Sequence, residues 1–195
     1  MTIKRGSPYG TPGSPPPGAV MVGSDAEARQ VLEAARRQGD PYPVLGLTGG
    51  DLCRTLGGTG ALEVTFPVDL GEVLIDGRLH LFVAHLVART RTWSDVVVAM
   101  NAQWLGRWNL GPKAHPGDGL LDTYRAHLAF GERLKVRARL HHGAHLPHPG
   151  IVESRTSAMQ VDDGPARRVW LDDIPIGVAR SLTVRLRPDA LTVVV

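Results

Sequence analysis

The sequence predicts an α+β protein, in which a small βαβ unit precedes a larger antiparallel β-sandwich. Residues 19–60 alternate short apolar runs with helix-like segments, as in a unit with parallel strands. Residues 61–195 contain short apolar strands separated by turn signals. The 195 residues can form one sizeable core together with a small lobe. We therefore expect a tail over residues 1–18, an α/β lobe over 19–60 and a β-sandwich over 61–195.

Composition narrows the classes of function. The net charge is only +3 and acidic and basic residues are interspersed, so we expect no nucleic-acid surface. The single cysteine, Cys53, excludes an internal disulfide and is compatible with a reducing cytoplasm. The longest apolar run, residues 79–88, is shorter than the roughly 20 residues of a membrane span. The first ten residues lack the apolar segment of a secretory signal. The expected location is the cytoplasm.

The lobe is predicted from its caps and apolar spacing. Residues 1–18 are rich in Pro, Gly and Ser, which predicts a tail or a strap over the surface. Apolar positions spaced by three and four residues predict a helix from Ser24 or Asp25 to about Gly39. Strands are predicted at 19–23 and 44–47. A second short helix is predicted over 52–56, with Asp51 as its N-cap.

The remainder of the chain reads as strands. Alternating apolar residues or dense β-branched runs mark each of them, and Asp76-Gly77 predicts a hairpin turn. Strict alternation of Leu134, Val136, Ala138 and Leu140 predicts a strand there as well. The predicted strands are 62–70, 73–75, 79–88, 96–100, 123–128, 134–140, 151–161, 169–171, 182–186 and 191–195.

Three acidic turns are candidate sites. Gly23-Ser24-Asp25 and Thr48-Gly49-Gly50-Asp51 each stand between a strand and a helix, where backbone amides can approach a phosphate. The same residues also serve as ordinary helix caps. The third turn contains Asp172 between apolar strands. A carboxylate there can act as a general base, or it can be a hairpin residue that faces water.

Other polar features have a structural and a functional interpretation. In the Pro/Gly-rich segment 111–122, Asp118 and Asp122 flank two leucines, and such a turn can hold a hard cation or simply cap itself. The histidines between residues 141 and 148 favour a polar turn over a zinc site, because prolines and a glycine interrupt them. Trp93, near two arginines, is the tryptophan that we expect to be exposed.

These motifs, in this order, resemble the diacylglycerol kinase-like lipid kinases, which include bacterial lipid kinases and sphingosine kinases. The family's GGDGT loop corresponds to residues 23–27 and its GTGND-containing stretch to residues 48–57. Its DDGLLD motif corresponds to residues 117–122 and its LDGE motif to residues 171–174. The resemblance covers residues 19–195.

The resemblance implies an ATP- and Mg²⁺-dependent kinase of a lipid hydroxyl, with its active site between the lobe and the β domain. It implies Asp172 as the catalytic base. It also implies a cation site formed by Asp118 with the backbone carbonyls of His115 and Leu120. The implied nucleotide-binding residues are Gly23, Ser24, Asp25, Thr48, Gly49, Gly50 and Asp51.

Departures from the motifs change the expected activity. Ala26 adds a Cβ beside the phosphate loop, Glu27 adds a carboxylate there, and Ile174 replaces the family's glutamate. Phosphoryl transfer depends on positioning and charge neutralisation, so we predict a catalytically inactive lipid- or partner-binding module. The alternative is an active lipid kinase whose nucleotide lobe is completed by another subunit. Expected partners are a lipid or a peripheral membrane surface, a second copy, or a partner subunit.

Overall fold

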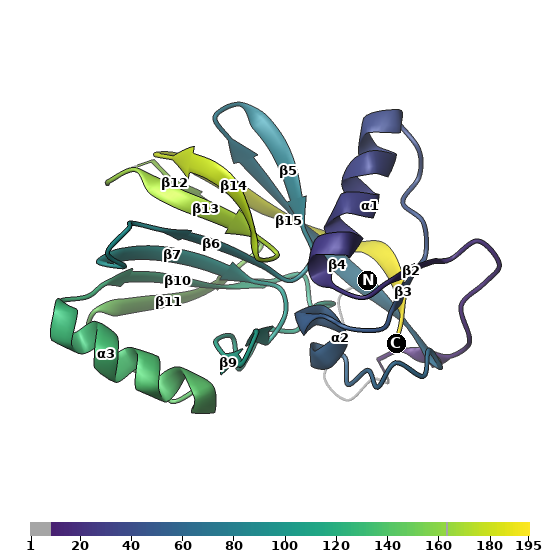
Figure 1. Ribbon diagram of the computed structural model, residues 1–195, viewed down its shortest axis with the longest axis horizontal. Coiled ribbons are helices and arrows are strands. Elements are labelled where there is room, and N and C mark those ends of the chain that lie inside the picture. The colour runs from purple at the N-terminus through teal and green to yellow at the C-terminus, as the bar shows by residue number, and fades with distance from the viewer. Residues whose placement is uncertain (1–8, 163) are drawn as a thin grey trace.

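A computed structural model describes residues 9–162 and 164–195 and shows two packed sheets with a helical lobe at one end (Figure 1). The predicted class, a small α/β lobe with a larger β-sandwich, is confirmed. The helical segments are α1 (Asp25–Gln38), α2 (Asp51–Thr55), α3 (Phe130–Arg139) and the 3-10 turn η1 (Leu140–His142). The strands are β1 (Thr11–Pro12), β2 (Val20–Val22), β3 (Leu45–Leu47), β4 (Val64–Ile75), β5 (Arg78–Phe82), β6 (His85–Arg89), β7 (Asp95–Met100), β8 (Trp104–Leu105), β9 (Trp108–Asn109), β10 (Leu121–His127), β11 (Ile151–Thr156), β12 (Ala158–Val161), β13 (Arg167–Leu171), β14 (Ile174–Ala179) and β15 (Leu182–Val194).

The lobe contains the predicted βαβ unit, β2–α1–β3, with its two strands parallel. Ser24 is the N-cap of α1 and accepts the Glu27 N–H, and Gly39 ends the helix in the left-handed conformation. Ala28 and Leu32 of α1 are buried against the strands. The amphipathic spacing in the sequence therefore located this helix correctly.

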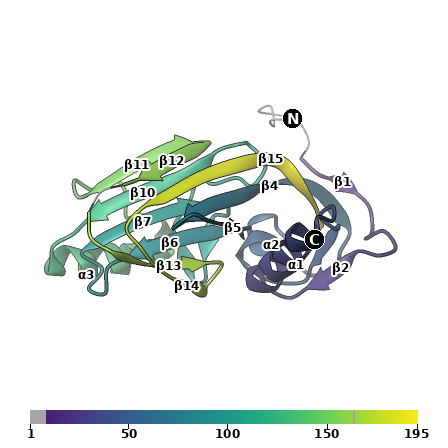
Figure 2. The same cartoon turned by 90° about the horizontal axis from the view of Figure 1, so that it is seen from above.

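One sheet joins the lobe to the sandwich. The described residues form a sheet in the order β1-β4-β15-β3-β2, to which β5 and β12 add at β4 and β15. β15 runs antiparallel to β4 over most of its length and then pairs in parallel with β3 through Val193 and Leu45. Figure 2 shows β4 and β15 passing side by side from the sandwich to the lobe. The lobe is thus fixed to the sandwich by continuous backbone hydrogen bonds.

The second sheet is antiparallel, in the order β11-β10-β7-β6-β13-β14. Alternation along β7 divides its side chains between two environments. Val97 and Ala99 enter the core between the two sheets, whereas Val96 and Val98 face the other side. α3 covers that other side, where Val136 packs with Ala126. The second sheet therefore has an apolar cluster on both faces.

The strand predicted at 134–140 is wrong, because residues 130–139 form α3. The segment is rich in Arg, Lys, Glu, Leu and Ala, which favour helices. Of the apparently alternating apolar residues, Val136 is buried and Leu134 is largely exposed. Four apolar residues in alternation were too short a pattern to distinguish a strand from a helix that packs by one side.

Several predicted strand boundaries are also wrong. The predicted strand 79–88 is two strands, because the chain leaves β5 in the first sheet and enters β6 in the second at Val83 and Ala84. Likewise, 151–161 divides into β11 and β12. Residues 182–194 form the single strand β15, with an irregularity between Arg187 and Leu191. Apolar character persists through such sheet changes, so the sequence pattern did not reveal them.

The N-terminal tail acts partly as a strap. β1 pairs with β4, and Tyr9 donates a hydrogen bond to the Pro67 carbonyl at 2.6 Å. Three consecutive prolines, residues 15–17, lie between β1 and β2, and residues 1–8 of the predicted tail lie outside the described residues. Among the helices that the structure describes, none is both long and apolar enough to cross a membrane.

Candidate functional site

The three acidic turns meet where the lobe joins the sandwich. Asp25 begins α1, Asp51 begins α2, and Asp172 lies in the turn between β13 and β14. His85, the first residue of β6, completes the group. Ligand atoms of Asp25, Asp51 and His85 all lie within 4.8 Å of one another. The fold therefore gathers into one buried cluster three carboxylates that are distant in the sequence.

Asp25 connects the two helix starts. Its carboxylate accepts the backbone N–H of Asp51 at 2.6 Å and that of Leu52 at 3.2 Å. The prediction that Asp51 caps α2 is wrong, because Gly50 is the N-cap and Asp25 receives the free N–H groups. Gly50 has φ +97°, and a Cβ there would meet the Asp25 carboxylate at 2.6 Å. Burial and the charge of Asp172 raise the pKa of Asp25 to about 7.

Asp51 interacts with the sandwich. Its carboxylate lies 3.2 Å from His85 Nε2 and accepts the Gly106 N–H at 2.7 Å. Burial acts to raise the pKa of Asp51, but these two hydrogen bonds outweigh it and lower the pKa. Burial acts to lower the pKa of His85, while Asp51 and the charge of Asp172 outweigh it and raise the pKa. The pair thus favours a protonated imidazole beside an ionised carboxylate.

Asp172, the implied catalytic base, is fully enclosed. Its carboxylate accepts three backbone N–H groups, from Val83 at 2.9 Å, Ala84 at 2.9 Å and His85 at 3.1 Å. These donors belong to the segment in which the chain changes sheets. The interpretation of Asp172 as a water-facing hairpin residue is wrong, because the side chain points inward and is 1% exposed. Burial raises its pKa. The observed contacts make Asp172 a connector between the β13–β14 turn and the β5–β6 crossover.

The predicted phosphate loop is closed by its own side chains. The Ser24 side chain, at the N-cap, accepts the Glu27 N–H at 3.2 Å, and Glu27 accepts the N–H of Gly23, one residue before the N-cap, at 2.6 Å. Thr48 donates its hydroxyl to a β2 carbonyl at 3.1 Å. A Cβ on Gly49 would lie 2.5 Å from the Gly23 carbonyl oxygen. A phosphate at this turn would compete with the Glu27 carboxylate, so these residues do not fit ATP in the observed arrangement.

A cation fits the cluster better than a nucleotide does. Asp25 and Asp51 can supply oxygen atoms, and His85 can supply a nitrogen once a cation displaces the proton that Asp51 favours on its ring, a donor set that can hold a metal ion. A positive charge there would also offset the repulsion that raises the pKa of Asp25. Mg²⁺ prefers oxygen ligands, so the imidazole makes the set less suited to Mg²⁺ than three carboxylates would be.

The predicted cation site at Asp118 belongs to a separate group of residues. Asp118 accepts the Leu120 N–H at 3.0 Å and forms an ion pair with Arg155. The His115 carbonyl accepts the Asp118 N–H at 3.3 Å. Asp69 anchors the same turn by accepting the Gly119 N–H at 2.7 Å. In this arrangement Asp118 neutralises an arginine and stabilises its own turn.

A second candidate site lies on the sandwich, between α3 and the sheet that contains β6, β7 and β10. It is a cavity of about 370 Å³, lined mainly by apolar side chains. Its lining residues are Val87, Thr92, Trp93, Val96, Val98, Leu105, Trp108, Leu110, Tyr124, Ala126, Leu128, Phe130, Arg133, Leu134, Val136, Arg137, Leu140, His145 and Ile151. This volume falls within the roughly 300–1,000 Å³ of typical ligand pockets.

Several polar atoms at this cavity have no hydrogen bond of standard geometry within the part of the chain that the structure describes. The Tyr124 hydroxyl, both ring nitrogens of His145 and the Trp108 Nε1 are buried without a hydrogen bond of standard geometry. Burial raises the pKa of Tyr124, which therefore stays a hydroxyl. Burial lowers the pKa of His145, against weaker opposing effects of Glu153 and the Leu110 carbonyl, which favours a neutral ring. Uncharged donors and acceptors thus line a largely apolar space.

Sequence reasoning missed three residues of these two sites. His85 is a polar residue within an apolar run, and that interruption was the available signal for a special position. His145 was assigned to a polar turn, yet it is 2% exposed. Tyr124 stands in an otherwise ordinary strand, and nothing in its neighbours indicated an unpaired hydroxyl.

Comparisons with known proteins agree at the level of the fold. A scan against protein-family models and a search of curated proteins each found no match. A solved structure of a diacylglycerol kinase from Bacillus anthracis str. Sterne is similar at a TM-score of 0.56 and 15% identity, over 78% of this chain and 67% of that chain. A second structure from that strain, provisionally named a diacylglycerol kinase, has a TM-score of 0.65 at 13% identity, over 91% and 78%. A third, also provisionally named, has a TM-score of 0.57 at 14% identity, over 78% and 70%. The resemblance inferred from the motifs is confirmed as a diacylglycerol kinase-like fold.

Proposed function

We propose that this protein is a catalytically inactive relative of the lipid kinases that binds a lipid in the cavity beneath α3. The observation that carries the proposal is this apolar cavity of about 370 Å³, with unpaired polar atoms in its wall. An apolar pocket with a few convergent polar groups is the usual form of a small-molecule site. A lipid supplies both kinds of contact, an acyl chain for the apolar lining and a polar head for the unpaired atoms.

The polar wall supports an uncharged head group. Tyr124 and His145 lie in contact, with ring centroids 5.9 Å apart, and both are buried. A head group with hydroxyl or ester oxygens can accept from Tyr124 and exchange a hydrogen bond with the neutral His145. A carboxylate is less suitable, because burial and then the negative charges of Asp122 and Glu153 already raise the pKa of Tyr124.

Side chains around the cavity support contact with a membrane surface. Trp93, Phe130 and Leu134 line the cavity and are 40%, 69% and 58% exposed. Exposed apolar side chains grouped in this way commonly mark a lipid or protein contact. Arg133 and Arg137 line the same cavity and can face anionic head groups while the apolar side chains enter the bilayer. We therefore propose that the protein binds to the membrane surface, both with and without a bound lipid.

The lobe supports the absence of phosphoryl transfer. Glu27 occupies the Gly23 N–H that a phosphate would need, and the Asp25 carboxylate is engaged by α2. The carboxylate of Asp172, the implied base, already accepts hydrogen bonds from three backbone N–H groups. Phosphoryl transfer requires a positioned phosphate and a free base, and this arrangement provides neither.

Two binding measurements test the proposal. Calorimetry with Mg-ATP should show no binding, and a long-chain monoacylglycerol should change the tryptophan fluorescence, because Trp93 and Trp108 line the cavity. The variant Ala126→Trp, which fills the cavity, should lose the lipid response, whereas Val152→Trp on the exposed side of β11 should keep it. Binding of Mg-ATP with phosphorylation of the lipid would instead favour an active kinase, completed by another subunit if activity appears only in a complex. An unchanged lipid response in Ala126→Trp would exclude this cavity as the binding site.

A further inference from the structure

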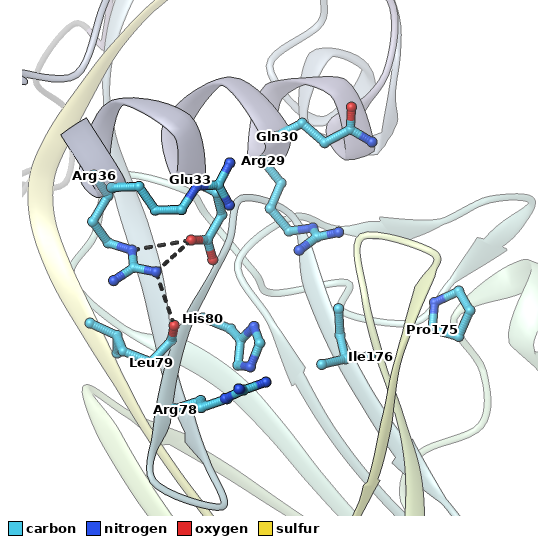
Figure 3. A pocket seen from close by; sticks show the side chains of 10 residues that line it. Arg29, Gln30, Glu33, Arg36, Arg78, Leu79, His80, Pro175 and Ile176 are labelled. Atoms are coloured by element: carbon cyan, nitrogen blue, oxygen red, sulfur yellow. Dashed lines mark hydrogen bonds and ion pairs between the residues drawn. The ribbon is translucent and has the colours of Figure 1, made fainter.

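Another pocket lies between α1 of the lobe and the strands β5 and β14 of the sandwich, away from α3. It has a volume of about 750 Å³ and is lined mainly by polar side chains. Figure 3 shows Arg29, Glu33 and Arg36 of α1 facing Arg78 and His80 of β5. The lining residues are Arg29, Gln30, Glu33, Arg36, Arg37, Arg78, Leu79, His80, Pro175 and Ile176. Neither the kinase-like motifs nor the lipid cavity includes this pocket.

Arg29 is the unusual residue of the pocket. It is only 8% exposed, yet within residues 9–162 and 164–195 no hydrogen bond or ion pair forms to its guanidinium, and its Nε is buried without an acceptor. Its side chain reaches from α1 toward Pro175 and Ile176 (Figure 3). Buried charges are normally paired, because removing a charge from water without compensation is costly. An arginine that lines a pocket and whose Nε is buried without an acceptor therefore indicates that a negative group belongs beside it.

The neighbouring charges do not supply that group. Glu33 is the one carboxylate among the lining residues, and it already accepts the Leu81 N–H at 2.8 Å and pairs with Arg36 at 2.7 Å. Arg37 and Arg78 add two further positive charges to the lining. The pocket thus carries more guanidinium groups than the protein neutralises.

The ionisation of His80 reflects the same positive potential. Burial lowers the pKa of His80, and the charges of Arg29, Arg36 and Arg78 lower it further, with Glu33 opposing them. The lining residues from β14, Pro175 and Ile176, carry no charge. A bound anion would reverse part of this effect, so the His80 ring is a built-in reporter of occupancy.

We propose that this pocket binds a phosphate group, with Arg29 as its principal ligand. A guanidinium presents a planar fork of N–H donors that matches phosphate oxygens, and such charge-assisted hydrogen bonds are about twice as strong as neutral ones. Arg78 and Arg37 border the same space and can complete the charge neutralisation. The phosphate can belong to a soluble phosphate compound or to the head group of a phospholipid. The two sources differ in whether a membrane must be present.

The experiment compares the wild-type protein with Arg29→Gln and with a matched control, Arg139→Gln, which removes an exposed arginine of α3. Inorganic phosphate is titrated at constant ionic strength while the His80 ring is followed by NMR. Separately, binding is measured to phosphatidylcholine vesicles with and without phosphatidic acid. We expect Arg29→Gln to weaken phosphate binding by about tenfold or more. Arg139→Gln should bind like the wild type.

Each outcome decides the proposal. Arg29-dependent binding of free phosphate, with a rise in the pKa of His80, supports it with a soluble source. Arg29-dependent binding to phosphatidic acid vesicles alone supports it with a lipid head group. Absence of both, or equal losses in Arg29→Gln and Arg139→Gln, overturns it. Thermal unfolding checks the fold of Arg29→Gln, which should be about as stable as the wild type without phosphate, because it removes a largely buried charge whose Nε has no acceptor among the described residues.

Discussion

The carboxylate of Glu27 accepts the backbone N–H of Gly23 at 2.6 Å, across the turn that leads from β2 into α1. In a phosphate loop, a backbone N–H of this turn would donate to the phosphate. Here the Gly23 N–H donates instead to Glu27, in the first turn of the helix. Because the Ser24 side chain accepts the Glu27 N–H in turn, the two bonds together hold the start of α1.

Replacing Glu27 tests that stabilising role. Glu27→Ala removes the acceptor, and we expect the free energy of unfolding to fall by about 1 kcal/mol. Glu27→Gln retains an acceptor oxygen and should lose less. The measurement is urea denaturation, with Glu63→Ala as a control at an exposed position. Loss of stability in the control but not in Glu27→Ala would contradict this stabilising role of Glu27.

The buried carboxylate of Asp25 predicts a pH dependence of stability. Because its pKa rises from 3.8 to about 7, the native state holds a proton that the unfolded state releases between about pH 4 and pH 7. The stability from this group is complete below about pH 4 and is lost as the pH rises through about 7. Relative to Asp25→Asn, the wild type should lose up to roughly 4 kcal/mol over this window.

Denaturation curves at several pH values would measure this difference. Asp40→Asn, at an exposed position just after α1, serves as the control and should follow the wild-type slope. If the free energy of unfolding varied with pH in the same way for the wild type and Asp25→Asn, the pKa of Asp25 would not be raised in the folded protein.

Asp172 should be a strong determinant of stability. Asp172→Asn keeps the shape and tolerates the positive φ of +48°, but an amide cannot accept all three N–H groups that the carboxylate receives. We expect a loss of about 2–4 kcal/mol. Asp173→Asn, at the exposed neighbouring turn position, should change stability little. A fully stable Asp172→Asn would mean that the carboxylate is not needed to join the β13–β14 turn to the β5–β6 crossover.

The exposed apolar side chains at the cavity predict a surface for membrane contact. The double substitution Phe130→Ser with Leu134→Ser should reduce binding to lipid vesicles by about tenfold or more, because each removed side chain contributes roughly 1.5–3 kcal/mol when buried. Stability should change little, since both residues are mostly exposed. Val152→Ser, which is 66% exposed on β11, is the matched control in a vesicle co-sedimentation assay. Equal binding of the double variant and the control would remove this surface from the proposal.

Removing the hydroxyl of Tyr124 should weaken lipid binding without lowering the stability of the protein. Tyr124→Phe removes a buried polar group that lacks a partner, so the free energy of unfolding should stay equal or rise. Affinity for a monoacylglycerol should fall about five- to tenfold, while affinity for an alkane of similar length should not change. Fluorescence titration with both compounds measures the difference. A loss of stability without a change in affinity would indicate a structural role for the hydroxyl.

Local patterns in the sequence predicted much of the framework. Spacing and caps located α1, the Asp76-Gly77 pair located the β4–β5 turn, and motif order indicated the kinase-like fold. α3 was missed because its few apolar residues alternate over a short stretch. The β5–β6 break was missed because the run stays apolar while the chain changes sheets.

The sequence by itself determined which residues carry charge and which segments are apolar, and these properties sufficed for the fold class and for the elements of the lobe, but not for α3 or the breaks between strands. Tertiary structure alone decided which charges became buried and what they contact. Asp25, Asp51 and Asp172 form one cluster only because β15 joins the lobe to the sandwich. Tyr124 and His145 face one cavity, and the Arg29 Nε is left without an acceptor among the described residues, only once distant elements have packed. Hydrogen bonding and desolvation depend on neighbours in space, which a linear pattern of residue types does not specify.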